Sequence, residues 1–234
     1  MSMAHKEKHP HIPARNVLDR IILGGSDGAI EGLATTSALN GAGLVFGTIA
    51  LAGFAFAVAG AIAMFFSSYL SRRSELRSLQ IDADREGMEI ETEPDEEKGE
   101  MRELLKKDGY EYAEVEVIMR RLEKNKPLFL KEMLRRELRV NIEDVGADPF
   151  VRPLLAGIAF LLLALLAVSP YYLAISRADA LLASGGLSVA ALFALGSRVF
   201  LPGNFDPREG AESALVGGVA AVLLYLVGVV VSAL

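Results

Sequence analysis

Two carboxylates, Asp27 and Glu31, lie four residues apart inside an apolar, glycine-rich stretch of the sequence, residues 18–39. In a helix this spacing puts both side chains on one face, one turn apart. An ionisable group at the centre of a membrane-spanning helix raises the free energy of membrane insertion by about 2.5–3.5 kcal/mol, so such a pair is expected only where it serves a function. The pair is therefore a candidate for an ion path.

A second set of acidic residues lies between residues 72 and 150, again at helical spacing. Two pairs are acidic, Glu86 with Glu89 and Glu97 with Glu100, and a third combines Met133 with Glu137. The like charges of the two acidic pairs weaken a helix by roughly 0.2–0.5 kcal/mol per pair, a cost that a divalent cation between them would reverse. Carboxylates on facing helices hold iron or manganese in helical bundles. The alternative is a solvated acidic helix face, and spacing alone leaves both open.

Apolar and charged residues are segregated along the chain. Hydrophobic residues make up 52% of the 234 positions and charged residues 23%, yet the charges concentrate between residues 72 and 152, and long apolar runs flank them. Runs of about 20 apolar residues cross a bilayer. The sequence predicts an all-α integral membrane protein with a soluble insert. The absence of cysteine excludes disulfides and thiolate metal sites.

Five transmembrane helices are expected, with the insert between the second and the third. Their ranges are 18–39, 47–70, 153–175, 178–201 and 211–234. The first and the fourth are expected to score poorly in hydropathy, the first because it is rich in Gly, Ser and Thr and the fourth because it contains Ser184-Gly185-Gly186. In the first, Gly24, Gly28 and Gly32 recur every four residues beside the acids. Small residues at this spacing let helix backbones approach closely, so this helix is expected to pack against protein.

Positive charges predict the orientation of the chain. Lys and Arg cluster before the first span, around the insert and between the last two spans, which is one side of the membrane if five spans alternate. Because such residues favour the cytosol, the N-terminus and the insert are expected there and the C-terminus on the opposite side. The expected organisation is a disordered tail (1–17), transmembrane helices (18–71), a cytosolic helical metal-binding domain (72–150) and further transmembrane helices (151–234).

The insert is expected to be a small helical bundle. Apolar residues at helical spacing predict helices over 71–90, 95–107, 110–124 and 127–140. The first continues the second span, because no strong helix breaker occurs before Pro94.

Three groups of residues, in this order and spacing, resemble the vacuolar iron transporter family. They are Asp19-Arg20-Ile21-Ile22-Leu23-Gly24-Gly25-Ser26-Asp27-Gly28, then Ala59-Gly60-Ala61-Ile62-Ala63-Met64 followed by Tyr69-Leu70-Ser71, and finally Met133-Leu134-Arg135-Arg136-Glu137-Leu138. The resemblance runs from about Asp19 to the C-terminus and includes the five-span count. Each motif alone is modest, whereas their order and spacing together are specific.

The resemblance implies a homodimeric exporter of cytosolic Fe²⁺, coupled to protons, whose path lies between the first and second spans at the dimer interface. In that family an aspartate of the Ser-Asp-Gly motif and a methionine of the second span line the path. The matching positions here are Asp27 and Met64. The family's cytosolic domain binds several metal ions through glutamates and a methionine. The matching positions here are Glu86, Glu89, Glu97, Glu100, Met133 and Glu137.

Two positions depart from the family pattern. Where the family carries Gly-Glu-Tyr at the cytosolic end of the second span, this chain has Ser67-Ser68-Tyr69, so a carboxylate at the mouth of the path is missing. Glu31 is an additional acid, at a position that is more usually uncharged in the family. Glu31 could thus take the place of the carboxylate that is missing at Ser68.

Two functions remain open. One is a secondary transporter that moves divalent transition metal out of the cytosol in exchange for protons. The other is a membrane-anchored iron-binding, buffering or ferroxidase-like protein, which would have no use for intramembrane acids. A thioether beside carboxylates suits Fe²⁺ better than Mg²⁺ or Ca²⁺, with Mn²⁺, Co²⁺ and Zn²⁺ left open, although Met64 could also be a packing residue. An acidic pI near 5.2 argues against nucleic-acid partners.

Overall fold

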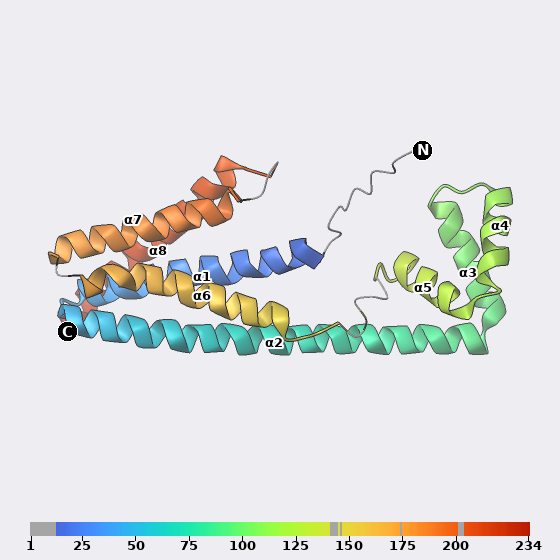
Figure 1. The fold of residues 1–234 in the computed structure, drawn as a ribbon, viewed down its shortest axis with the longest axis horizontal. Coiled ribbons are helices and arrows are strands. Elements are labelled where there is room, and N and C mark those ends of the chain that lie inside the picture. Colours follow the sequence, from blue (N-terminus) through green and yellow to red (C-terminus); the bar gives the residue numbers. More distant parts are fainter. Residues whose placement is uncertain (1–12, 141–144, 146, 174, 201–203) are drawn as a thin grey trace, which may run out of the picture. The chain divides into compact units, whose positions relative to one another are not determined.

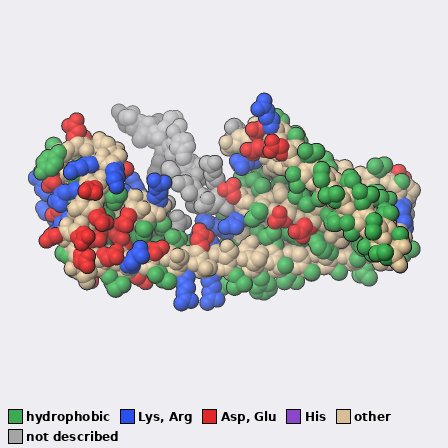
Figure 2. Space-filling model, turned by 180° about the vertical axis from the view of Figure 1, so that it is seen from behind, with side chains coloured by type: hydrophobic (Ala, Val, Ile, Leu, Met, Phe, Trp, Pro, Cys, Tyr) green, Lys and Arg blue, Asp and Glu red, His purple; other side chains and the backbone are tan. Residues whose placement is uncertain are grey.

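The computed structural model describes the whole chain except residues 1–12, 141–144, 146, 174 and 201–203. Across the described residues the structure is helical and contains no strand, in agreement with the all-α prediction. The chain forms two compact units, Met1–Tyr69 with Phe150–Leu234, here called the apolar unit, and Leu70–Pro149, here called the charged unit. On the face seen in Figure 2, hydrophobic side chains cover most of the apolar unit, whereas acidic and basic side chains crowd the charged unit.

The apolar unit is a bundle of helices. Its elements are α1 (Pro13–Gly41), the first part of α2 (Phe46–Thr92), α6 (Val151–Val168), the 3₁₀ turn η1 (Ser169–Tyr172), α7 (Arg177–Gly196) and α8 (Pro207–Ser232). Helix α1 packs against α6, α7 and α8, and α7 packs against α8 (Figure 1). The expected tail over 1–17 lies mostly outside the described residues, and α1 already begins at Pro13. Helix α7 ends before the expected residue 201, where the chain turns at Arg198 with a φ of 52°.

Four segments are long and apolar enough to cross a membrane: α2, Val151–Tyr172, α7 and α8. They correspond to four of the five expected spans. Helix α1 is not among them, because Gly, Ser, Thr and acidic residues lower its hydropathy. A crossing by α1 therefore stays a prediction.

The glycines of α1 let it lie directly on α6. A Cβ added at Gly24 would collide with the carbonyl oxygen of Ala156, and one at Gly28 with that of Phe160. At Gly32 an added Cβ would lie 2.9 Å from the Cα of Ala164. The expectation that this first helix packs closely against protein is confirmed.

Buried polar side chains also tie α1 to η1 and α7. Asn40 donates from Nδ2 to the hydroxyl of Tyr171 and, at 2.9 Å, to the carbonyl oxygen of Thr36. The Thr36 hydroxyl lies 3.3 Å from that of Ser184, which donates to the carbonyl of Ala167 at 2.6 Å. Such bonds give buried polar groups partners where there is no water.

The charged unit is a small helical bundle. It contains the second part of α2, which runs unbroken to Thr92, and the helices α3 (Pro94–Lys107), α4 (Tyr112–Leu122) and α5 (Lys126–Arg136). The continuation of the second predicted span is confirmed. Helix α4 begins at a capping box formed by Glu111 and Glu114, and α5 at Asn125, whose side chain accepts from the backbone N–H of Leu128.

One hydrophobic core holds this bundle together. It consists of Met101, Leu105, Val115, Met119, Leu122, Phe129 and Met133. Helix α5 ends at Arg136 rather than at the expected residue 140, and Arg139 has a positive φ of 56°, which does not continue a helix.

Candidate metal-binding sites

Asp27 and Glu31 lie on α1 one turn apart, where the sequence places them. In a single chain Asp27 is half-buried and Glu31 is exposed, and the two are close enough for their charges to repel. Within the described part of the chain neither carboxylate has a hydrogen-bond or ion-pair partner. Both are therefore free to take a cation, a proton or a group supplied from outside this chain.

Met64 lies on α2 and is partly buried. Its sulfur accepts a hydrogen bond from the Ser68 hydroxyl at 3.5 Å, and its side chain packs against the core formed by Ala57, Phe160 and Ala164. A packing role for Met64 is thus visible. These contacts do not test whether the sulfur also meets the ion, so the place of Met64 in the path remains a prediction.

The charged unit buries two of its predicted ligands. Glu86 on α2 is 2% exposed and Glu97 on α3 is 6% exposed. One carboxylate oxygen of each, Oε1 of Glu86 and Oε2 of Glu97, is buried and has no hydrogen-bond partner among the residues that the structure describes. Leaving a buried acceptor unsatisfied costs about 1–3 kcal/mol, which a bound cation would offset.

The carboxylates of this cluster raise one another's pKa. Burial, followed by the charges of Glu137 and Glu97, raises the pKa of Glu86 from 4.5 to about 8. The pKa of Glu97 is raised by burial and then by the charge of Glu100, and that of Glu100 by burial and then by Glu137. At pH 7 Glu86 therefore keeps its proton and can donate it in a hydrogen bond to Glu97.

All five predicted glutamates belong to one electrostatic cluster, here called the glutamate cluster. The charges of Glu89 and Glu137 each act on Glu86, Glu97 and Glu100. Glu89 comes from α2 with Glu86, and Glu137 follows the last turn of α5. The structure thus brings together acids that are about 50 residues apart in sequence.

Met133 is fully buried among the apolar residues of the core, so the structure gives it a packing role. A role as a ligand stays a prediction. Among the described residues no three His, Asp or Glu side chains are arranged so that they could hold a metal ion as they stand. Repulsion between like charges separates carboxylates, and a divalent cation would have to draw them together.

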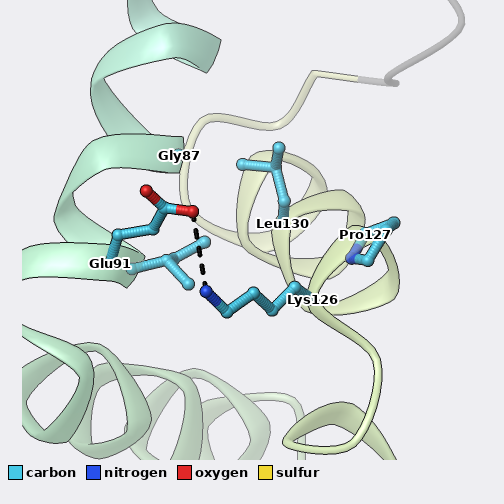
Figure 3. A pocket seen from close by; sticks show the side chains of 6 residues that line it. Gly87, Glu91, Lys126, Pro127 and Leu130 are labelled. Atoms are coloured by element: carbon cyan, nitrogen blue, oxygen red, sulfur yellow. Dashed lines mark ion pairs between the residues drawn. The ribbon is translucent and has the colours of Figure 1, made fainter.

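A pocket of about 290 Å³ lies beside the cluster in the charged unit, between α2 and the start of α5 (Figure 3). It is lined by Gly87, Ile90, Pro127 and Leu130, together with Glu91 and Lys126, whose Oε1 and Nζ form an ion pair at 3.5 Å. Both charged side chains are exposed, so the pair itself contributes little. The pocket lies directly after Glu86 on α2, but none of the five glutamates of the cluster lines it.

Sequence reasoning missed three participants. The charges of Glu96 and Glu103 act on Glu100, and Ser68 contacts the sulfur of Met64. The two acids lie four residues before and three residues after Glu100, so the spacing rule applied elsewhere would have found them. For Ser68 the sequence contains no such signal. Its one distinction is that it stands where the family carries the Glu of Gly-Glu-Tyr.

The fold and its acids define a multi-pass helical membrane protein that carries carboxylates both among its apolar helices and in a charged helical unit. The VIT family model matches residues 18–229. The chain belongs to the VIT family.

Relatives of known name cover nearly the whole chain. The chain is 31% identical over 228 residues to "Vacuolar iron transporter 1" of Arabidopsis thaliana, which covers 97% of this chain and 90% of that protein. It is 29% identical over 225 residues to "Vacuolar iron transporter" of Centaurea cyanus, covering 95% and 91%. It is also 29% identical to "Vacuolar iron transporter" of Toxoplasma gondii, covering 96% of this chain and 77% of that protein.

Proposed function

We propose that this protein transports Fe²⁺ out of the cytosol in exchange for protons, and that it is not an enzyme. The observation that carries the proposal is the pair Asp27 and Glu31, which has no hydrogen-bond or ion-pair partner in the described part of the chain and lies on a helix that packs among apolar helices. Acids at such a position are costly unless they serve an ion or a proton. The relatives named as iron transporters favour iron as the ion.

The path of the ion would run along Asp27, Glu31 and Met64. Two carboxylates and a thioether form a donor set suited to Fe²⁺. The same donors accept Mn²⁺, Co²⁺ and Zn²⁺ to different degrees, so these ions are competitors to be tested.

The charged unit would collect metal for the path. Its glutamate cluster offers several carboxylates and two unsatisfied buried oxygens, on Glu86 and Glu97. A cation that binds there displaces the proton of Glu86, so binding is linked to pH. In this proposal the charged unit, expected from the sequence as a domain over residues 72–150, lies in the cytosol with the N-terminus, while the C-terminus lies across the membrane.

A second copy of the chain would complete the path. Glu31 is exposed on a single chain, and an exposed carboxylate on a membrane helix cannot face lipid at low cost. With α1 as a fifth span, two copies that meet along this face would cover the acids. The proposal therefore includes a homodimer in the lipid bilayer.

Flux measurements in proteoliposomes test the proposal. Fe²⁺ movement is recorded with and without a pH gradient and compared with movement of Mn²⁺, Co²⁺ and Zn²⁺. Uptake of Fe²⁺ driven by an opposing proton gradient is the expected result. Metal binding without any flux would contradict transport and favour the alternative, a membrane-anchored iron-binding or ferroxidase-like protein, for which the glutamate cluster alone suffices.

A further inference from the structure

A groove follows the seam between α7 and α8 in the apolar unit, with α1 beneath it. Two adjoining pockets make up this α7–α8 groove. The residues of α1 that line them are Ile22, Ser26, Ile30, Leu33 and Ser37. They recur every three or four positions and so share one face of α1, which places the pockets in line along it. Leu192, which packs on Gly217, lies where the two meet.

One end of the groove is apolar. It has a volume of about 260 Å³ and is lined mainly by Leu, Val and Ala side chains together with Gly185 and Gly218. At both glycines no atom lies within 4 Å of the place where a Cβ would stand. Both glycines therefore face open space, and a side chain at either position would extend into it.

The other end is charged. It has a volume of about 560 Å³ and is lined by Arg198, Glu209 and Glu212 together with serine and apolar side chains. Arg198 Nε lies 3.8 Å from Glu209 Oε2. Among the described residues Glu212 has no ion-pair partner. This end thus offers one guanidinium and two carboxylates, one of them unpaired.

The apolar part fits within one leaflet of a bilayer. From Gly218 to Leu226, the α8 residues that line it, the helix rises about 12 Å, less than half of the hydrocarbon core of about 30 Å. Acyl chains are the solvent that such a groove meets at this depth. The charged end, in the first turns of α8 and just after α7, then falls at headgroup level.

We propose that the α7–α8 groove binds one phospholipid with a primary-amine zwitterionic headgroup, of the ethanolamine type. One of its two acyl chains fills the apolar end while the other stays in the bilayer, its phosphate pairs with Arg198, and its ammonium donates hydrogen bonds to Glu212. Two carboxylates against one guanidinium disfavour an anionic headgroup. A choline headgroup has no N–H to donate.

Lipid retention tests this site. The full-length protein is reconstituted with equal amounts of phospholipids bearing ethanolamine, choline and glycerol headgroups, re-extracted, and its bound lipid counted by native mass spectrometry. One ethanolamine lipid per chain is the expected result. Gly218→Leu fills the apolar end and should abolish retention. Gly186→Leu is the control, because an added Cβ there also meets open space but Gly186 does not line the groove.

The headgroup assignment has its own variants. Arg198→Gln and Glu212→Gln should each weaken retention by about fivefold, the scale of one partly exposed charge pair, whereas Arg208→Gln, at the same end but outside the pocket, should not. These variants keep the test valid if Gly218→Leu fails to fold. Equal retention of all three headgroups, or a groove covered by a second copy of the chain and free of lipid, would overturn the proposal.

Discussion

The glutamate cluster and the Asp27–Glu31 pair meet the same electrostatic difficulty in different ways. In the charged unit three elements bring five acids together, and the repulsion is relieved by a proton on Glu86, whose pKa rises to about 8. On α1 two acids stand on one helix face with no partner among the described residues. A cluster made by several elements can tighten around an ion and hold it. Two acids on one helix can bind an ion fully only with ligands from outside that helix, an arrangement that suits ion passage better than ion storage.

The largest effect is expected from Asp27→Asn, which tests whether passage depends on the α1 pair. The amide keeps the shape but removes the charge that attracts the cation, so Fe²⁺ flux should fall by about a hundredfold or more, which corresponds to about 2.7 kcal/mol of lost attraction. Size-exclusion profiles should match the wild type. Asp19→Asn, at the start of the same helix, is the control, and wild-type flux in Asp27→Asn would remove this residue from the path.

The glutamate cluster is tested by replacing its four acids on α2 and α3. With Glu86, Glu89, Glu97 and Glu100 changed to Gln, calorimetry on the full-length protein should show loss of divalent binding to the charged unit. Flux should be lowered but not abolished, because the path itself is intact. The exposed acids Glu111, Glu114 and Glu123 changed to Gln make the control. An unchanged binding stoichiometry in the cluster variant would mean that the acids form a solvated face.

Glu31→Gln separates passage from proton coupling. Two charges one turn apart repel in a low dielectric, so an incoming cation should displace a proton that the pair holds. The variant should weaken the dependence of Fe²⁺ flux on the pH gradient more than it weakens metal binding. Full pH dependence in this variant would place the coupling elsewhere.

The pH response of the charged unit gives a smaller effect of known sign. Because the pKa of Glu86 is raised in the fold from 4.5 to about 8, the folded state holds a proton that the unfolded chain releases. Metal-free stability should therefore fall as pH rises from about 4.5 to about 8. The midpoint temperature of thermal unfolding, measured at pH 6 and pH 8, tests this expectation. In Glu86→Gln the midpoint should depend less on pH, whereas a wild-type midpoint that rises with pH would contradict the prediction.

The smallest effect is expected from Met64→Leu. This swap nearly conserves volume and costs less than about 1.5 kcal/mol in a core, but it removes the sulfur that Ser68 contacts. Selectivity for Fe²⁺ over Mn²⁺ in competitive flux should fall by up to about tenfold. Unaltered selectivity would leave Met64 as a packing residue on Phe160.

Local patterns in the sequence predicted much of this structure. The every-fourth-residue glycines foretold the packing of α1, and the lack of a breaker before Pro94 foretold the length of α2. Helical spacing picked out the acids of α2 and α3. What spacing could not reveal is burial: Glu86 and Glu89 are both glutamates of α2, yet only Glu86 is buried, next to the Glu97 side chain.

Contacts between segments that are distant in sequence could not be predicted for the same reason. No linear pattern indicates that Asn40 donates a hydrogen bond to Tyr171, or that glycines on α7 and α8 face a groove. Single-helix hydropathy likewise could not decide whether α1 crosses the membrane, since its polar content is tolerated only within the assembled bundle.

The hydrogen bonds from α1 to η1 and α7 bear on how the protein is made. Ribosomes deliver α1 first, when Tyr171 and Ser184 do not yet exist to meet Asn40 and Thr36. A weakly apolar helix whose polar side chains lack hydrogen-bond partners is not stable in lipid on its own. If α1 is a fifth span, its stable insertion must therefore wait for the last third of the chain, and truncation before Ser184 should leave α1 open to proteolysis in the cell.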